Sequence, residues 1–278
     1  MQDALVTSPT SRVRRGQATA AVFHAGGVAA LWFQVIFVLA VVIGLVVFTD
    51  RRSLLEAILA PESRHATRLT LLTVSITTAL SMLLAIPAAY ALSQRQTRLN
   101  FLVDTLLDLP IVMPPIAAGL ALLILFGYYL GDPMQKLGIY LPYTKAGIVV
   151  AQFFTTMTFA LRSAKAAFDS VNPRLPAVAR TLGSSDWRAF RRVVLPLAHN
   201  GLVAGAVLTW ARCMGLFGPV VMFCGATEYR TVILPTAIYL KNSVGDLEVA
   251  AGGTLFLMAI ALVTLIVFKR LGGRGYLW

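Results

Sequence analysis

Residues 172–201 read NPRLPAVARTLGSSDWRAFRRVVLPLAHNG, a basic run that lies between long apolar segments. The run contains one acid, Asp186, and several arginines: Arg174, Arg180, Arg188, Arg191 and Arg192. Four apolar residues recur at the spacing of one helical face: Leu175, Val178, Ala179 and Leu182. Gly183 follows at the position where a glycine commonly ends a helix. The spacing therefore predicts a short amphipathic helix that stops before Gly183.

A second short helix is predicted directly after this glycine. Ser184 or Ser185 can cap its beginning, and Pro196 is expected to end it. The two helices should meet at a sharp angle in a loop between membrane-spanning segments. We call residues 172–196 the elbow.

The composition of the 278-residue chain excludes an ordinary soluble protein. Hydrophobic residues make up 58% of the chain and charged residues 13%, with a mean hydropathy of +0.76. The net charge of +12 could suggest nucleic-acid binding. The basic residues, however, do not form a groove with interleaved aromatic residues; they lie between apolar runs, as the topology of a membrane protein would place them. The chain is therefore predicted to be a multi-pass membrane protein.

Six apolar runs are long enough to be considered as membrane spans. They cover approximately residues 28–48, 69–92, 105–130, 145–161, 201–223 and 249–268. The predicted fold is an all-α membrane protein with six transmembrane helices and a two-helix loop between spans four and five. The predicted domains are an N-terminal tail, residues 1–27, and a transmembrane domain, residues 28–278, with the two-helix loop at about 164–197.

Within this pattern, three local features carry structural predictions. Prolines 110, 114 and 115 predict that the third span is kinked or discontinuous in its first half. An apolar patch around Pro235 is too short to cross a membrane and predicts a helix or a re-entrant piece on the outer side. One face of the second span carries hydroxyl groups, which indicate either close helix packing or a pathway lining: Thr70, Thr73, Thr77 and Ser81.

The distribution of basic residues predicts the orientation in the membrane. The two tails and the loops on their side hold 15 of the 24 Lys and Arg residues, and the opposite loops hold eight. Because cytoplasmic loops carry the excess of Lys and Arg, both termini and the elbow are predicted to be cytoplasmic.

No residue pattern predicts catalysis or cofactor binding. The chain lacks the Gly-x-x-x-x-Gly-Lys-Ser/Thr phosphate loop, and its three histidines do not have zinc-ligand spacing. No catalytic residue, metal ligand or cofactor is therefore predicted, and active transport would require energy from a partner. Cys213 and Cys224 are interpreted as buried packing residues.

Arg212 is the one basic residue predicted inside a span. A charge there costs at least about 2.5–3.5 kcal/mol on insertion scales, so it normally faces protein, water or a counter-charge. Two interpretations stay open: a structural bond to backbone carbonyls at a kink, or a positive charge that favours an anion in the translocation pathway. In the second interpretation, Thr209 and Thr78 also make the pathway favour anions, but more weakly than Arg212 does.

The elbow resembles the loop signature of ABC importer permeases, written EAA, three residues, Gly, nine residues, Ile, any residue, Leu-Pro. Ala177, Val178 and Ala179 occupy the EAA positions, with Ala177 replacing the glutamate. The remaining signature positions are Gly183, Val193, Leu195 and Pro196. The resemblance implies that the elbow docks on a cytoplasmic ATPase and transmits its motion to the spans. It thus implies a cytoplasmic two-helix coupling loop at about 164–197, between spans four and five, within a transmembrane permease domain, residues 28–278. Arg180, Arg188, Arg191 and Arg192 would hold it at that interface.

A second motif is similar to the molybdate, tungstate and sulfate permeases of this family, which carry Ala-Arg-Ala-x-Gly-Glu-Phe-Gly. The chain has Ala-Arg-Cys-Met-Gly-Leu-Phe-Gly at residues 211–218, with Leu216 in place of the glutamate. Residues 234–239 and 245–248 also resemble this branch. The resemblance implies import of a small oxyanion across the inner membrane by alternating access.

The partners that the resemblance implies are a cytoplasmic ABC ATPase subunit, a periplasmic or lipid-anchored binding protein and a second permease subunit in a homodimer or heterodimer. The alternatives are an ABC permease for another small solute and a stand-alone secondary carrier or channel. The elbow and the lack of acidic residues within the spans argue against the carrier. A membrane scaffold would leave Arg212 and the hydroxyl face without a purpose. Copurification of an ATPase subunit separates these classes.

Overall fold

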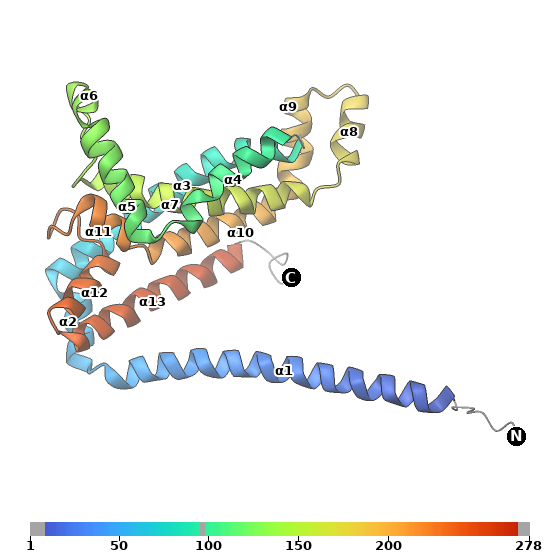
Figure 1. The fold of residues 1–278 in the computed structure, drawn as a ribbon, viewed down its shortest axis with the longest axis horizontal. Coiled ribbons are helices and arrows are strands. Elements are labelled where there is room, and N and C mark those ends of the chain that lie inside the picture. Colours follow the sequence, from blue (N-terminus) through green and yellow to red (C-terminus); the bar gives the residue numbers. More distant parts are fainter. Residues whose placement is uncertain (1–8, 95–97, 272–278) are drawn as a thin grey trace, which may run out of the picture. The chain divides into compact units, whose positions relative to one another are not determined.

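The computed structural model describes the backbone of residues 9–94 and 98–271 and the side chains of residues 23–94, 102–267 and 270. Every regular element in these ranges is a helix (Figure 1), so the all-α prediction is confirmed. The chain divides into two compact units, Met1–Asp50 and Arg51–Trp278. The side chains of the predicted basic tail, at residues 12–15, and the C-terminal residues 272–278 lie outside the described parts.

The helices follow one another along the chain with short connections. Their bounds are α1 (Pro9–Phe48), α2 (Arg51–Leu59), α3 (Pro61–Gln94), α4 (Arg98–Val112), α5 (Pro115–Leu123), η1 (Ile124–Tyr129), α6 (Gly131–Lys136), α7 (Lys145–Asp169), α8 (Arg174–Thr181), α9 (Asp186–Ala189), η2 (Phe190–Val194), α10 (Leu195–Met214), α11 (Gly218–Cys224), α12 (Leu234–Ser243) and α13 (Leu247–Leu271). The elements η1 and η2 are π-helical turns.

The first unit consists of α1. From Phe23 to Phe48 this helix is apolar and long enough to cross a membrane, and none of its most apolar window is buried within the structure. A helix that is apolar on every side has no polar face to turn toward water, which is typical of a membrane span. The predicted boundary between residues 27 and 28 lies within this helix.

The second unit is built around three helices, α3, α7 and α10. Helices α3 and α7 run parallel, because Leu69 shares a hydrophobic cluster with Ile148 near their beginnings and Ala85 shares another with Leu161 farther along. Helix α10 runs the opposite way. Ala198, near its beginning, belongs to the Ala85 cluster, whereas the Cys213 thiol near its end contacts Thr156 of α7.

Two glycines allow α10 to approach α7 closely. A Cβ atom added to Gly201 would lie 2.6 Å from the Ala167 Cβ, and one added to Gly205 would lie 2.6 Å from the Ser163 Cβ. Two small residues four positions apart are typical of closely packed membrane helices, because the backbones themselves then come into contact.

The span count is only partly confirmed. Among the described residues, four helices are long and apolar enough to cross a membrane: 23–48, 61–94, 186–214 and 247–267. A fifth span results if the bent pair 102–112 and 115–129 counts as one. The predicted fourth span lies within α7, a continuous helix that does not pass the same test, so the six-span count remains a prediction.

The third predicted span is broken at its prolines, as expected. Its two halves are bent by 107° at Met113 and Pro114, and Pro115 begins the second half. Pro110 lies inside α4 without ending it. The kink therefore lies at the consecutive prolines, where two backbone donors in a row are missing.

The predicted bounds of the fifth span, 201–223, are wrong. Helix α10 already begins at Leu195 and ends at Met214, and a separate short helix, α11, begins at Gly218. Pro219 explains the interruption, because its ring would clash with the carbonyl of Gly215 in a continuous helix. The apolar patch around Pro235 forms α12, one of the two alternatives that the sequence left open.

Candidate functional site

The elbow contains the sharp turn that the sequence predicts. After the last residue of α8, Gly183 adopts a φ of +85°. The Gly183 N–H donates to the Arg180 carbonyl at 2.9 Å, and the Ser184 N–H donates to the Ala179 carbonyl at 3.0 Å. These two bonds make the Schellman arrangement, in which a residue with positive φ, usually glycine, satisfies the last carbonyls of a helix.

Ser185 caps the second helix, and its hydroxyl accepts a hydrogen bond from the Arg188 N–H at 3.4 Å. The prediction that Pro196 ends this helix is wrong, because α9, η2 and α10 form one continuous run from Asp186 to Met214. The Leu195 N–H reaches back five residues to the Phe190 carbonyl. This wider π turn, directly before the proline, accommodates the missing donor and the bulk of its ring. The second arm of the elbow is therefore continuous with a membrane helix.

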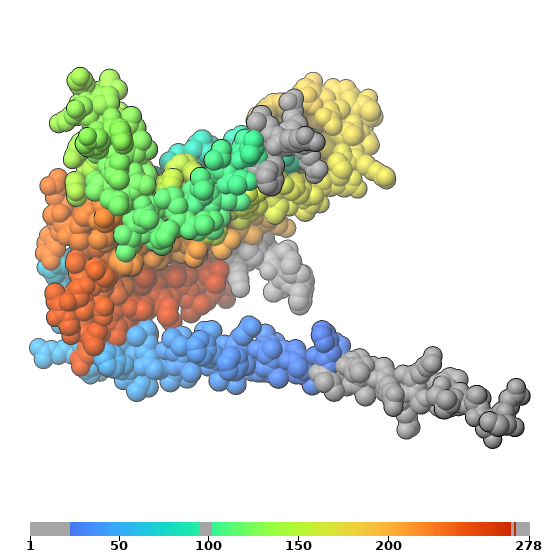
Figure 2. Space-filling view, viewed as in Figure 1, coloured from blue at the N-terminus to red at the C-terminus, as the bar shows by residue number. Residues whose placement is uncertain are grey.

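The apolar face of α8 is turned outward. Val178 is 55% exposed and Leu182 is 81% exposed, and Leu175 on the same face is exposed as well. Within α8 only Pro176 is buried. The yellow surface of this part of the chain projects at one end of the second unit in Figure 2. Exposed apolar residues at positions i, i+3 and i+7 are typical of a helix that lies in a groove of a partner protein.

An aromatic cluster joins the elbow to the membrane helices. Phe190, at the beginning of η2, is 4.5 Å from Tyr90 of α3 and 6.0 Å from Phe168 of α7, measured between ring centroids. Trp187 stacks on Phe190 from the exposed side at 5.7 Å. A displacement of α9 would therefore act on α3 and α7 through direct ring contacts. Sequence reasoning missed Tyr90 and Phe168, because their proximity depends on the packing of distant helices.

The basic residues of the elbow differ in their contacts. Arg180 forms an exposed ion pair with Asp186 across the turn, at 3.2 Å. Such exposed pairs contribute about 0–1 kcal/mol, so this one orients the side chain more than it stabilises the fold. The Arg188 Nε donates to the Ser185 hydroxyl at 3.3 Å. Arg191 and Arg192 are exposed on the following turn.

The other elbow residues that the resemblance singled out lie at different depths. Ala177 and Pro196 are exposed, whereas Ala179, Val193 and Leu195 are half-buried. The structure thus brings all the predicted elbow residues together at one end of α7 and α10. Most of the outward-facing residues lie on α8, and the half-buried Val193 and Leu195 lie where η2 passes into α10.

Arg212 lies in the last turn of α10 and is exposed on the surface of the unit. Its guanidinium carbon lies over the Phe159 ring, 4.7 Å from the centroid, a cation–π contact. Among the described carboxylates, none forms an ion pair with it. Arg212 therefore places a positive charge on the surface of a membrane helix.

Thr209 and Thr78 do not share the exposure of Arg212. Thr209 is 0% exposed, and its hydroxyl donates to the Gly205 carbonyl at 2.8 Å. Thr78 is buried on α3. Within one chain, neither hydroxyl is open to a pathway.

The hydroxyl face of α3 packs against its neighbours. The Thr77 hydroxyl contacts the Gln152 Oε1 of α7 at 3.1 Å, and the Leu234 N–H donates to the Thr70 hydroxyl at 2.8 Å. Thr73 and Ser81 are also buried. Close helix packing, the first of the two interpretations of this face, therefore describes the single chain.

A charged cluster that the sequence reasoning did not identify fastens α4 to α7. The Arg162 guanidinium forms ion pairs with Asp104, at 3.1 Å, and with Asp108. The Thr158 hydroxyl donates to the Leu107 carbonyl at 2.6 Å one turn away. Asp104 and Asp108 lie within the bent third span, so the expectation of spans without acids is wrong. The four-residue spacing of the two aspartates was the available signal.

The geometry defines a class of protein. It is a multi-pass α-helical membrane protein with an outward-facing elbow at one end. The described residues contain no group of three His, Cys, Asp or Glu that could hold a metal ion. Solved structures share this fold. A bacterial ABC transporter involved in the import of the acidic polysaccharide alginate has a TM-score of 0.75 at 17% identity and covers 95% of this chain and 99% of its own. The MetNI methionine ABC transporter has a TM-score of 0.60 at 19% identity and covers 74% and 93%.

Sequence comparison gives the family. Residues 81–274 match the model of the binding-protein-dependent transport system inner membrane component, and the chain belongs to this family. The molybdenum transport system permease protein ModB of Mycobacterium tuberculosis is 32% identical over 84% of this chain and 88% of its own length. The sulfate transport system permease protein CysT of Escherichia coli is 31% identical over 79% and 80%. The molybdate/tungstate permease WtpB of Thermococcus kodakarensis is 29% identical over 81% and 85%.

Proposed function

We propose that this chain is the permease subunit of an ATP-driven importer and carries a small oxyanion of the molybdate, tungstate or sulfate type. The elbow is the observation that supports the coupling role. The apolar face of α8 is exposed within the described chain, and the second arm of the elbow is continuous with α10. This arrangement suits a helix that docks in the groove of a cytoplasmic ATPase.

In the proposed mechanism, the elbow works as a lever. The ATPase subunits close on ATP and displace α8 and α9, and the Phe190 cluster passes this displacement to α3 and α7. Rigid-body movement of the helices then exposes the pathway alternately to each side of the membrane. A second permease subunit completes the pathway, and a binding protein delivers the substrate from outside. In this orientation residues 1–27 and the loop at about 164–197 are cytoplasmic.

The oxyanion assignment has two supports. The relatives named above transport molybdenum, sulfate and tungstate. Arg212 contributes a positive charge without an ion-pair partner among the described acids, and such a charge in a membrane favours an anion nearby. We assign Thr209 and Thr78 to the packing that orients α10 behind this arginine.

Copurification tests the docking role. The importer is expressed with its ATPase subunit, and an aspartate replaces one exposed apolar residue of α8 in Val178→Asp or Leu182→Asp. Removing one such side chain from an interface and burying a charge there should lower the yield of copurified ATPase about tenfold or more. Leu137→Asp, at an equally exposed apolar residue outside the elbow, is the control and should leave the yield unchanged.

Undiminished copurification in both α8 variants would contradict the docking role. If wild-type permease retained no ATPase and took up molybdate on an imposed ion gradient, the chain would be a secondary carrier instead.

A further inference from the structure

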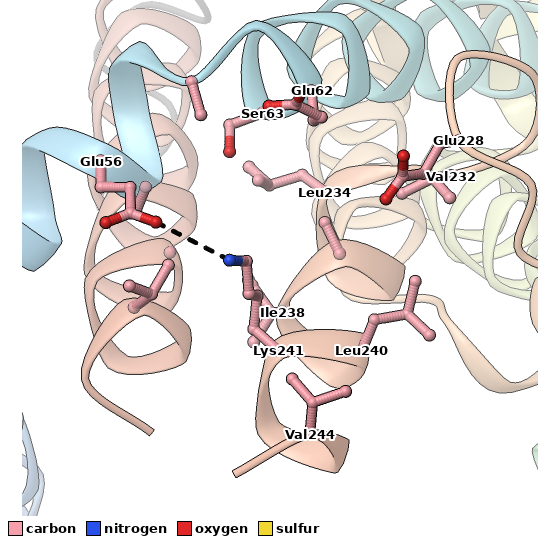
Figure 3. Close-up of a pocket in the computed structure, with 15 residues that line it drawn as sticks. Glu56, Glu62, Ser63, Glu228, Val232, Leu234, Ile238, Leu240, Lys241 and Val244 are labelled. Atoms are coloured by element: carbon pink, nitrogen blue, oxygen red, sulfur yellow. Dashed lines mark ion pairs between the residues drawn. The ribbon is translucent and has the colours of Figure 1, made fainter. Parts of the chain in front are cut away.

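The second unit also contains a charged pocket, which is separate from the elbow and from Arg212. It has a volume of about 360 Å³ and lies between α2, the first turn of α3, the segment before α12, α12 itself and α13 (Figure 3). Helix α3 begins at this pocket and ends near the elbow, since Tyr90 contacts Phe190. The pocket is therefore at the end of the unit opposite the elbow.

The charges that line the pocket are mainly acidic. Glu56, Glu62 and Glu228 face a single cation, Lys241. The Lys241 Nζ lies 3.8 Å from a Glu56 oxygen (dashed in Figure 3) and is also 3.3 Å from Asp246, which is outside the pocket. The lining is thus acid-rich, although the chain as a whole carries a net charge of +12.

Two of these acids form no ion pair with a basic side chain among the described residues, although the charge of Lys241 also favours the ionised form of Glu62. Glu62 accepts a hydrogen bond from the Tyr229 hydroxyl at 2.8 Å, and no ion pair joins Glu62 or Glu228 to a basic side chain. The bond to Glu62 raises the pKa of Tyr229, so this hydroxyl keeps its proton and remains a donor. Figure 3 shows the Glu228 carboxylate directed into the space above Leu240. The pocket therefore offers carboxylate oxygens that a further cation could pair with.

Apart from Ser63, the rest of the lining is apolar. Val232, Leu234, Ile238 and Val244 form walls between the acids. A lysine or arginine side chain combines an aliphatic stem with a cationic head, and such side chains bury the stem against apolar surface. The volume is at the lower end of ligand pockets, which suits one or two inserted side chains. Shape and charge both match a basic side chain.

Two other classes of occupant fit less well. The carboxylates that form no ion pair would repel an oxyanion, so the pocket does not suit binding of the proposed substrate. A calcium ion takes six to eight oxygen ligands. Among the residues that the structure describes, no three acids or histidines lie close enough together to hold a metal ion.

We propose that this pocket receives a lysine or arginine side chain of the binding protein that delivers the substrate. The inference rests on the proposed function, because that function puts the elbow in the cytoplasm and so the opposite end of the unit on the side from which substrate arrives. In this contact the permease contributes the acidic residues and the binding protein contributes the basic residue. Charge pairs of this kind accelerate association and fix the orientation of the partner.

The test measures binding of the cognate binding protein, loaded with molybdate and fluorescently labelled, to the complete importer in lipid nanodiscs. Glu228→Gln and Glu62→Gln each remove one charge with little change in shape. Each should weaken binding several-fold at low salt, and the double variant about tenfold or more, with a smaller dependence on salt than the wild type. Asp132→Asn, at an exposed acid of α6 outside the pocket, is the control and should bind like the wild type.

A charge swap between the permease and the binding protein tests whether binding can be restored. Glu228→Lys should abolish binding at low salt, and a glutamate in place of the contacting basic residue of the binding protein should restore it. Unchanged affinity and salt dependence in the double variant would overturn the inference. So would loss of radioactive calcium binding in that variant without loss of protein binding, because the pocket would then be a cation site.

The copurified ATPase provides the separate readout. If every variant retains its ATPase and binds the binding protein with the affinity of the wild type, the inference fails and the importer assignment stands. If the wild-type permease retains neither the ATPase nor the binding protein, the proposed function itself fails.

Discussion

At the scale of single residues, Arg212 is the most informative position. Burial inside protein would have required a carboxylate or a set of carbonyls to pair with it, because an uncompensated buried charge is costly. The structure instead leaves it exposed over Phe159. An exposed arginine on a membrane helix needs a second subunit, water or an anion next to it. The proposed translocation pathway at a subunit interface would supply all three.

Replacement of Arg212 tests its role. Arg212→Gln keeps a polar side chain and removes the charge, so ATP-dependent molybdate uptake should fall about tenfold, the effect of losing about 1.4 kcal/mol of favourable interaction. Arg212→Lys keeps the charge and should retain most of the uptake. Uptake is measured in proteoliposomes, with the amount of inserted protein as the reference. Equal uptake by the Gln variant and the wild type would make Arg212 a structural residue.

At the scale of elements, the elbow depends on one backbone conformation. Gly183 has open space around its Cα, so the obstacle to a larger residue there is the φ of +85° and not a clash with neighbours. An L-residue other than glycine in the left-handed region costs about 1–2 kcal/mol, with asparagine among the better tolerated. The angle between α8 and α9 is consequently sensitive to this one position.

A matched pair of glycine variants tests the element. Gly183→Ala should loosen the elbow, and amide hydrogen exchange over residues 174–189 should become faster while the exchange of α10 stays the same. Molybdate uptake per ATP hydrolysed should fall. Gly215→Ala is the control, because Gly215 also has open surroundings but a φ of −90°. Gly183→Asn should restore most of the coupling. Identical exchange and coupling in the two alanine variants would show that the turn does not set the function of the elbow.

At the scale of the whole molecule, orientation in the membrane is the main prediction. The excess of Lys and Arg on the tails and the elbow side predicts that the elbow is cytoplasmic and that the α12 end lies outside. The two native cysteines, Cys213 and Cys224, are buried, so an introduced thiol can be labelled selectively. Exposed positions at opposite ends of the second unit are available in Ser243 on α12 and Asp186 in the elbow.

Thiol labelling tests this orientation. An impermeant maleimide should label Ser243→Cys in intact cells and Asp186→Cys only in inverted membrane vesicles. The double variant Cys213→Ala/Cys224→Ala without a new thiol gives the background. Labelling of Asp186→Cys from outside the cell would reverse the topology and remove the elbow from the reach of an ATPase.

Local sequence features predicted local structure well. The glycine at 183 and the serine at 185 fixed the turn and the cap of the elbow, because both depend only on the conformation and hydrogen bonding of neighbouring residues. The consecutive prolines likewise predicted the break between α4 and α5. Pro196 misled the prediction, since a π turn absorbed it without ending the helix.

Composition and periodicity by themselves determined that the chain is a helical membrane protein with an amphipathic elbow, because apolar length and helical spacing are properties of contiguous sequence. Only the tertiary structure decided which way each face points. It turned Leu182 outward, buried Thr209, joined Arg162 to Asp104 and Asp108, and assembled the acidic pocket from α2, α3, α12 and α13. These features depend on contacts between segments far apart in the chain, and such contacts are set by the packing of whole helices.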